Sequence, residues 1–325
     1  MQNEHLITRQ VEEYITYKRS LGFKIAVEAD ELKRFAAFTR SVGHNGSLTS
    51  DIAMRWATCK NDSSRFYMAR KLETVHTFAK YISAFDSQAQ IPQLGVFGKC
   101  HGRTNPYIYS DDEVSLLMTE AKKLFSPDGI RAYTVSVAIG LLRATGLRVS
   151  ELTLLKNEDV HFDEEYLFIN SSKFKKSRIV PLHPTVTAEL LKYRVFVTEK
   201  LGSRPETEYF FISSYGQKFS TRAFRYAFQL IRPILNADCN SSKAQKFRLY
   251  DFRHTFACET IRCWLEAGAD VNQKLFLLST YMGHAKPEDT FWYLSATPGL
   301  LAISCKRYEA AFDSAFAHEG CEVLR

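Results

Sequence analysis

Apolar residues recur every three to four positions over four stretches in the first third of the chain, which predicts four helices. The first two helices both end at a glycine, which favours the left-handed conformation of a helix C-terminus. The second of them covers residues 28–42. Thr49 or Ser50 is suited to cap a short third helix, and a fourth covers about residues 63–85. Since no strand-like alternation interrupts these helices, we expect a small helical domain over residues 1–104.

The periodicity stops over residues 86–109, where prolines, glycines and polar residues predict a linker. A second domain, over residues 105–325, opens with a capping-box pattern that runs from Ser110 to Glu113. A turn near Ser171 has alternating residues on both sides and predicts a β-hairpin. The fold class is therefore mainly α with a small β-sheet (α+β). Helices of the second domain are expected at about residues 110–124, 130–144, 148–156, 184–201, 220–236, 250–267, 271–281, 286–295 and 299–316.

Composition and charge narrow the class of protein. The chain has 325 residues, of which 45% are hydrophobic and 24% charged, enough for two domains with cores of their own. We find no apolar run of membrane-spanning length and no signal-peptide layout at the N-terminus, so we expect a cytoplasmic protein that does not enter a membrane. Seven cysteines without a CxxC pair argue against disulfides and zinc, and we expect no metal and no cofactor. The net charge of +7 suits a nucleic-acid partner without establishing one.

Four separated clusters carry groups suited to phosphate chemistry. The first is ATGLRVSEL, with Arg148 and Glu151, and the second is the basic stretch SKFKKSRIVPL on the predicted hairpin. The third is YDFRH, with Arg253, and the fourth is MGH, which ends at His284 and is followed nine residues later by Tyr293. Guanidinium groups donate paired hydrogen bonds to phosphate oxygens, and phosphoryl transfer depends mainly on positioning and on stabilising negative charge. Surface salt bridges for the arginines and core packing for the tyrosine are the alternatives.

In this order and spacing the clusters resemble the signature of the tyrosine recombinases, or phage-type integrases, over about residues 110–295. The resemblance implies a site-specific recombinase that cleaves and rejoins double-stranded DNA through a 3′-phosphotyrosyl intermediate. It implies that Tyr293 is the nucleophile and that Arg148, Arg253 and His284 bind the scissile phosphate. It also implies that the helical N-terminal domain is a core-binding domain that holds the DNA together with the catalytic domain.

Supporting roles follow from the same resemblance. Lys173 aligns with a hairpin lysine that protonates the leaving 5′-oxygen, although Lys175 and Lys176 are close by and the whole turn could instead act as a phosphate clamp. Glu151 and His254 correspond to residues that orient the site.

Tyr250 departs from the family pattern, because a histidine is usual at this position. A phenol can donate a hydrogen bond to phosphate, but a pKa near 10 makes it a poor base at neutral pH. Either Tyr250 supplies only that hydrogen bond and another group takes the proton of the nucleophile, or Tyr250 is itself the attacking residue.

The remaining expectations concern partners. Seven basic residues of the first domain are expected to contact DNA phosphates: Lys18, Arg19, Lys33, Arg34, Arg65, Arg70 and Lys71. The helix at 299–316 has an apolar face that, in the family, docks into a neighbouring protomer; packing on its own domain is the alternative. Four strand breaks imply a homo-tetramer on DNA, with related recombinases as further partners and a mobile genetic element as the setting. A telomere-resolving or type IB topoisomerase-like enzyme and an inactive DNA-binding regulator are the other interpretations.

Overall fold

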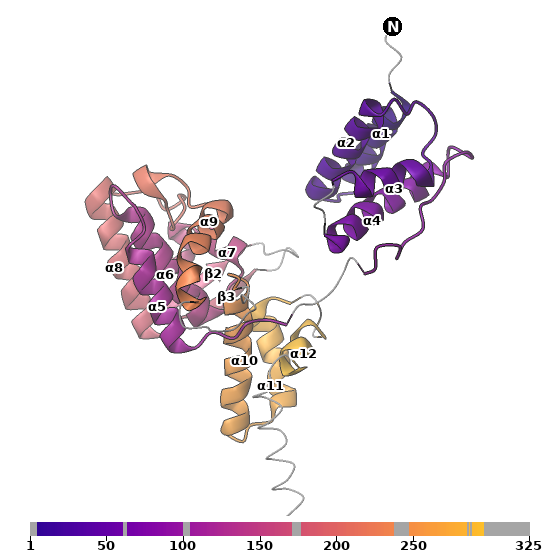
Figure 1. The fold of residues 1–325 in the computed structure, drawn as a ribbon. Coiled ribbons are helices and arrows are strands. Elements are labelled where there is room, and N and C mark those ends of the chain that lie inside the picture. Colours follow the sequence, from indigo (N-terminus) through magenta and orange to yellow (C-terminus); the bar gives the residue numbers. More distant parts are fainter. Residues whose placement is uncertain are drawn as a thin grey trace, which may run out of the picture. The chain divides into compact units, whose positions relative to one another are not determined.

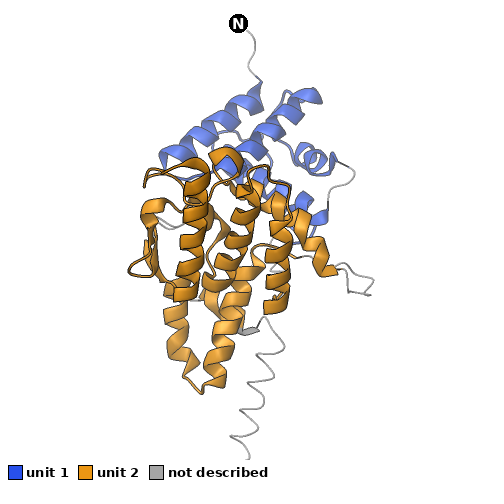
Figure 2. Ribbon diagram, turned by 90° about the vertical axis from the view of Figure 1, so that its left-hand side faces the viewer, with its two compact units in different colours: residues 1–104 blue, residues 105–325 orange. Residues whose placement is uncertain are grey.

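The computed structural model describes residues 5–60, 64–99, 105–170, 177–236, 247–284, 286 and 288–295. These residues are mostly helical and include one three-stranded sheet, which confirms the predicted fold class. The chain divides into two compact units, residues 1–104 and residues 105–325 (Figures 1 and 2). The helix predicted at residues 299–316 lies outside the described residues.

The first unit contains four helices, each with an apolar stripe that faces a common core. Leu32, Phe35, Val75 and Phe78 are among the fully buried side chains of this core. Thr49 caps the third helix, because its hydroxyl accepts the backbone N–H of Ile52 at 3.3 Å. The helices are α1 (Leu6–Ser20), α2 (Ala26–Ser41), α3 (Ser50–Thr58) and α4 (Arg65–Ile82).

The described part of the predicted linker is tied to each unit by hydrogen bonds. Residues 86–99 form no helix or strand, but the backbone N–H of Gln90 donates to the carbonyl of Leu48 at 2.8 Å. The ring of His76 is 2.7 Å from the carbonyl of Pro92. At the other end of the linker, the backbone N–H of Tyr109 donates to Thr255 in the second unit at 3.0 Å.

Lys71 is buried, which contradicts the expectation that it contacts DNA. It lies on the core face of α4, one turn before Val75, and its side chain is only 2% exposed. Its ammonium donates to the carbonyl of Trp56 at 2.9 Å and lies 3.9 Å from the centre of the Trp56 ring. Among the other six candidates, Lys18 is half-buried and the rest are exposed: Arg19, Lys33, Arg34, Arg65 and Arg70.

The first helix of the second unit begins with the predicted capping box at Ser110. The Ser110 hydroxyl accepts the N–H of Glu113 at 3.2 Å, and the Glu113 carboxylate accepts the N–H of Ser110 at 2.8 Å. The α-helices of this unit are α5 (Asp111–Lys122), α6 (Ile130–Thr145), α7 (Val149–Leu154), α8 (Pro184–Leu201), α9 (Thr221–Ile231), α10 (Asp251–Glu266), α11 (Val271–Met282) and α12 (Glu288–Ser295). Short 3₁₀ turns are η1 (Asn157–Asp159), η2 (Ser214–Gly216) and η3 (Arg232–Asn236).

Two elements differ in detail from the sequence prediction. The hairpin of β2 (Tyr166–Ile169) and β3 (Arg178–Pro181) gains a third antiparallel strand, β1 (Val160–His161), which pairs with β2. The helix predicted over residues 220–236 ends as an α-helix at Ile231 and continues as η3. Pro233 explains this change, because proline has no N–H to donate within an α-helix.

Two apolar cores hold the site-bearing elements of the second unit. The larger one surrounds α6, which buries side chains on nearly all sides between α5, α8 and α10. The smaller one joins α10, α11 and α12, the yellow and light-orange helices in Figure 1, and includes Ile261, Leu278, Met282 and Tyr293. The end of α6 and this three-helix group therefore bring three of the sequence clusters to one place. Among the described helices, none is long and apolar enough to cross a membrane.

Candidate active site

Arg148 is placed by a sharp turn between α6 and α7. Gly146 ends α6 in the left-handed region, with a φ of +61°, and a Cβ there would lie 2.6 Å from the ring of Phe256. Glycine is thus required both by the backbone and by the close packing. Arg148 then caps α7, and its backbone N–H donates to the Glu151 carboxylate at 3.0 Å.

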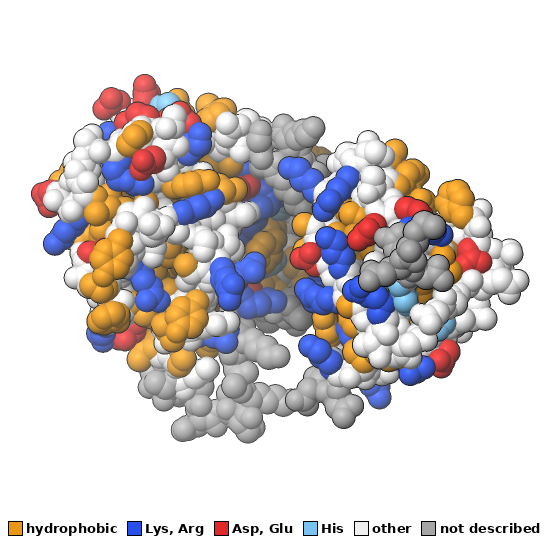
Figure 3. Space-filling model, turned by 90° about the horizontal axis from the view of Figure 1, so that it is seen from above, with side chains coloured by type: hydrophobic (Ala, Val, Ile, Leu, Met, Phe, Trp, Pro, Cys, Tyr) orange, Lys and Arg blue, Asp and Glu red, His pale blue; other side chains and the backbone are white. Residues whose placement is uncertain are grey.

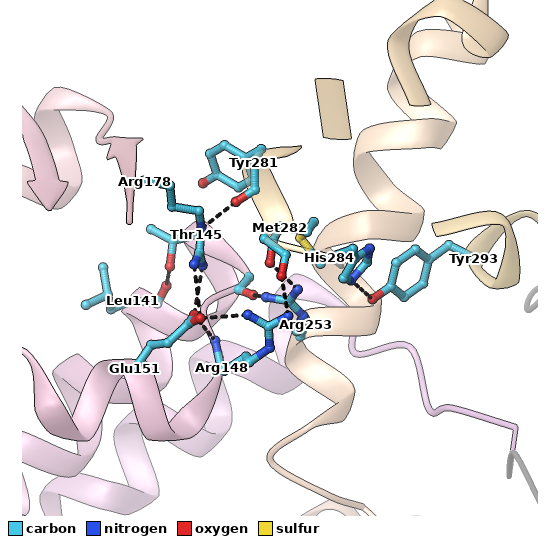
Figure 4. A network of polar contacts seen from close by, with 12 residues as sticks. Leu141, Thr145, Arg148, Glu151, Arg178, Arg253, Tyr281, Met282, His284 and Tyr293 are labelled. Atoms are coloured by element: carbon cyan, nitrogen blue, oxygen red, sulfur yellow. Dashed lines mark hydrogen bonds and ion pairs between the residues drawn. The ribbon is translucent and has the colours of Figure 1, made fainter. Parts of the chain in front are cut away.

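Glu151 is a buried carboxylate shared by two arginines. Nη1 of Arg148 donates to its Oε1 at 2.7 Å, while Arg178 from β3 donates to both carboxylate oxygens, at 3.0 and 2.8 Å (Figure 4). Burial by itself would raise the pKa of Glu151, but the bonds and charges of Arg178 and Arg148 outweigh it and lower the pKa to about 2. Glu151 is therefore ionised at neutral pH.

Arg253 lies almost completely buried on α10, with 1% of its surface exposed. Its Nη1 donates to the carbonyl of Gly146 at 2.8 Å and its Nη2 donates to the carbonyl of Met282. Its Nε is buried and has no hydrogen-bond partner among the described atoms. A buried cationic donor left without an acceptor is a ready binding group for an anion.

The C-terminal end of α11 collects the three arginines. Gly283 closes this helix in the left-handed region, with a φ of +64°. The three consecutive carbonyls of residues 281–283 each accept from one guanidinium: Arg178 at 2.7 Å, then Arg253, then Arg148 at 2.6 Å (Figure 4). Free carbonyls and the negative end of the helix dipole favour cations there. One helix terminus thus gathers positive charge from three separate elements.

His284 follows directly, and Tyr293 on α12 faces it. The Nδ1 of His284 is 2.7 Å from the hydroxyl of Thr290, and its Nε2 is 3.4 Å from the phenol oxygen of Tyr293. Burial, Arg253 and Arg148 lower the pKa of His284 to about 4. Burial raises the pKa of Tyr293 to about 12, although Arg253 opposes this shift. At neutral pH both side chains are therefore uncharged.

Tyr250 and His254 form aromatic contacts next to Tyr293. The rings of His254 and Tyr293 make a T-shaped contact, with centroids 5.2 Å apart. The rings of His254 and Tyr250 make another, with centroids 4.9 Å apart. Tyr250 is 49% exposed, whereas His254 is buried. The structure thus brings together Arg148, Glu151, Tyr250, Arg253, His254, His284 and Tyr293. Lys173, Lys175 and Lys176 lie outside the described residues.

A groove of about 450 Å³ opens beside Arg148 and Tyr250, and three further arginines line it: Arg225, Arg232 and Arg248. Sequence reasoning missed these residues and Arg178. Arg225 and Arg232 stand seven residues apart, which is two helical turns, so their shared face could have been recognised. Arg178 gave no such signal, because its carboxylate partner lies 27 residues away.

Stability should fall with acidification in a way that depends on His284. Its folded pKa of about 4 lies below the ordinary value of 6.5, so the unfolded chain binds the proton first. The stability that neutral His284 contributes to the fold is fully present above about pH 6.5 and is lost as the pH falls towards 4. We expect the melting temperature to drop less between those pH values in His284→Gln than in the wild type. The exposed His183→Gln serves as control, and an equal drop in all three proteins would contradict the assigned burial.

Among the described residues, no cluster of three or more His, Cys, Asp or Glu side chains could hold a metal ion. The groups gathered in the site are guanidiniums, phenols and imidazoles, with one carboxylate that two arginines bind. Such a set can bind a phosphate and present a nucleophile to it.

Residues 108–299 match the model of the phage integrase family. The chain therefore belongs to this family, the tyrosine recombinases, which confirms the resemblance seen in the sequence. The integrase/recombinase y4rB of Sinorhizobium fredii is 33% identical over 307 residues, which cover 93% of this chain and 97% of that protein. Tyrosine recombinase XerD of Listeria innocua is 26% identical over 286 residues, which cover 87% of this chain and 83% of that protein.

Solved structures agree on the fold. The integrase of transposon Tn1549 in complex with a circular intermediate DNA superposes with a TM-score of 0.64 at 16% identity, over 92% of this chain and 99% of that one. The recombinase XerH bound to its difH substrate gives a TM-score of 0.61 at 17% identity, over 88% of this chain and 81% of that one.

Proposed function

We propose that this protein is a site-specific DNA recombinase that cuts and rejoins DNA strands through a 3′-phosphotyrosyl intermediate. The observation that carries the proposal is the position of Tyr293: its phenol contacts His284, whose pKa is lowered by the charges of Arg253 and Arg148 as well as by burial. A nucleophile, a neutral base and two guanidiniums in one place are the groups that attack on a phosphodiester requires.

The scissile phosphate would lie between the two arginines. The unpartnered Nε of Arg253 offers one charge-assisted hydrogen bond, and Arg148 faces the arginine-lined groove. Tyr250 lines the same groove and is exposed enough to donate its hydroxyl to a second phosphate oxygen. Negative charge that develops on the non-bridging oxygens during attack is stabilised by these donors.

The cleavage step exchanges one phosphodiester for another. The Tyr293 oxygen forms a bond to phosphorus, the bond from phosphorus to the 5′-oxygen breaks, and the 5′-oxygen leaves with a proton. The phosphotyrosine keeps the energy of the broken bond, so a 5′-hydroxyl can attack it in the reverse direction without ATP. Lys173 is the proposed proton donor to the leaving oxygen, with Lys175 and Lys176 close to it in sequence.

His284 is the group best placed to take the proton of Tyr293. Its Nε2 lies 3.4 Å from the phenol oxygen, and in the tautomer in which Nδ1 donates to the Thr290 hydroxyl, Nε2 is free to accept. The depressed pKa of His284 reflects burial and two nearby arginines, whose charge a bound phosphate would offset. Tyr250 then need only donate a hydrogen bond, and His254 supports the ring of Tyr293.

The DNA partner is supported by the basic surface. Lys and Arg side chains are spread over the face seen in Figure 3, with some Asp and Glu side chains among them. In the first unit we propose Lys18, Arg19, Lys33, Arg34, Arg65 and Arg70 as phosphate contacts, so that this unit acts as a core-binding domain. Exchange between two duplexes needs four cuts, and with one nucleophile in each chain a homo-tetramer is expected. The similarity to a protein named as an integrase/recombinase supports a role in DNA integration, for which we propose a mobile genetic element as the setting.

Covalent capture tests the proposal and needs no defined target sequence. Purified protein is incubated with a pool of randomised duplexes nicked near their centre, so that the cut end diffuses away and the intermediate is trapped. We expect a protein–DNA adduct that survives denaturation and a captured pool that converges on one sequence. Adducts without sequence convergence would favour a topoisomerase-like enzyme, and DNA binding without an adduct would favour a regulator.

A further inference from the structure

Arg178 is the one arginine of the carbonyl-bound trio that neither the sequence patterns nor the proposed mechanism use. It is the first residue of β3 and pairs with Ile169 of β2, so its backbone is fixed by the sheet. Its side chain is 9% exposed and donates to the Tyr281 carbonyl through Nε and to Glu151 through both Nη atoms. All its nitrogens are thus engaged within the protein.

The sharing of Glu151 is unequal between the two arginines. Arg178 forms a two-bond fork with the carboxylate, whereas Arg148 makes one side-chain bond to it and uses its other terminal nitrogen for the Gly283 carbonyl. Forked pairs are the stronger arrangement. One carboxylate cannot offset the charge of two guanidiniums, and because Arg178 takes the fork, most of the positive charge of Arg148 remains available to an anion. Arg148 is also the member that lines the groove.

Gly283 provides independent support that this arrangement is specific. A Cβ at this position would lie 2.8 Å from Nη1 of Arg178 and 3.4 Å from Nη1 of Arg148. Both guanidiniums therefore pack against the bare backbone at the end of α11. The site holds both side chains in contact with a position that only glycine can fill without displacing them.

We propose that Arg178 is a positioning residue for DNA cleavage: by binding Glu151 and the end of α11, it leaves the positive charge of Arg148 largely unopposed and its guanidinium fixed for the scissile phosphate. This inference rests on the proposed function. Without Arg178, the Glu151 carboxylate would interact with Arg148 alone. It would then compete with the phosphate for the same guanidinium. The defect would come from the carboxylate that remains, so removal of that charge as well should repair it.

The test compares Arg178→Gln, Glu151→Gln and the double variant on the captured DNA sequence. We expect Arg178→Gln to cleave about 100-fold more slowly in a single turnover, as for loss of one electrostatic contact to the reacting phosphate. The double variant should recover at least about tenfold of that loss, because Arg148 is no longer paired with a carboxylate. If Arg178 were purely structural, the double variant would cleave no faster than Arg178→Gln.

DNA affinity gives a second readout that does not depend on cleavage. Each phosphate contact changes the slope of log affinity against log salt by roughly 0.9. Arg178→Gln should make the slope less steep by about one such contact, although Arg178 itself has no phosphate to touch, and the double variant should restore it.

Arg204→Gln is the matched control. Arg204 is 14% exposed, pairs with Glu208 at 2.7 Å and donates to the Tyr209 carbonyl at 3.0 Å, but lies outside the site. We expect its cleavage rate to stay within about twofold of the wild type, as for a substitution that touches no reacting group. If Arg178→Gln does not fold, Arg178→Lys keeps the charge, loses the fork and should cleave at an intermediate rate.

Wild-type rates in Arg178→Gln, or no recovery in a folded double variant, would overturn the inference. A wild-type protein that forms no adduct would instead contradict the proposed function, and the salt slopes would still decide whether Arg178 controls Arg148.

Discussion

Tyr293→Phe should bind DNA with unchanged affinity and form no covalent adduct. The substitution removes one oxygen and keeps the ring that packs with Ile261 and Met282, so the fold should be retained. Loss of a nucleophile typically lowers the rate by several orders of magnitude, and we expect at least about a 10⁴-fold loss of cleavage. Single-turnover cleavage of the captured duplex and a gel-shift titration measure the two quantities separately.

Tyr281→Phe is the matched control for this experiment. Tyr281 is also mostly shielded, and burial raises the pKa of its phenol to about 12 as well, but its hydrogen bond with Arg178 is accepted by the backbone carbonyl and not by the phenol. It should cleave like the wild type. Tyr250→Phe should retain the adduct with a reduced rate, since it loses a hydrogen bond and not the nucleophile. An adduct that persists in Tyr293→Phe would exclude Tyr293 as the attacking residue.

Arg253→Lys should lose cleavage by about 10²- to 10³-fold while leaving most DNA affinity intact, as for removal of one preorganised donor from a reacting oxyanion. A lysine cannot reach the carbonyls of Gly146 and Met282 and also present a third donor in a fixed plane. The residual charge cannot replace the geometry, because the phosphate must be held in line with Tyr293 for attack.

This variant should also be less stable, because a buried carbonyl left without a donor costs about 1–3 kcal/mol. Arg204→Lys, which keeps its charge beside Glu208, should lose less stability and no activity. If Arg253→Lys melts earlier but cleaves at the wild-type rate, Arg253 is structural and does not bind the scissile phosphate.

Local sequence patterns predicted most of the elements. Caps at Thr49 and Ser110 and the glycine after α6 mark helix ends through short-range hydrogen bonds and backbone conformation, which the sequence carries directly. The prediction was wrong at Lys71, where the helical spacing that predicts burial was overridden by the charge of the side chain. A lysine can be buried when an aromatic ring and a carbonyl receive its ammonium, and that partner is 15 residues away.

The site was predictable in its residue types but not in its supporting contacts. Family-like spacing pointed to Arg148, Arg253, His284 and Tyr293, and the structure places them together. The convergence of three arginines on the end of α11 depends on how β3, α7 and α10 pack, which no local pattern encodes. The proposed proton acceptor for Tyr293, His284, is likewise indicated by a distance in the structure and not by a sequence motif.

The nucleophile is identified most directly by mapping the DNA-linked amino acid. The trapped adduct is digested with nuclease and protease, and the peptide that carries the residual nucleotide is fragmented in a mass spectrometer. We expect the modification on Tyr293 alone. A nucleotide on Tyr250, on Tyr281 or on a serine would contradict the assignment of the nucleophile and the mechanism built on it.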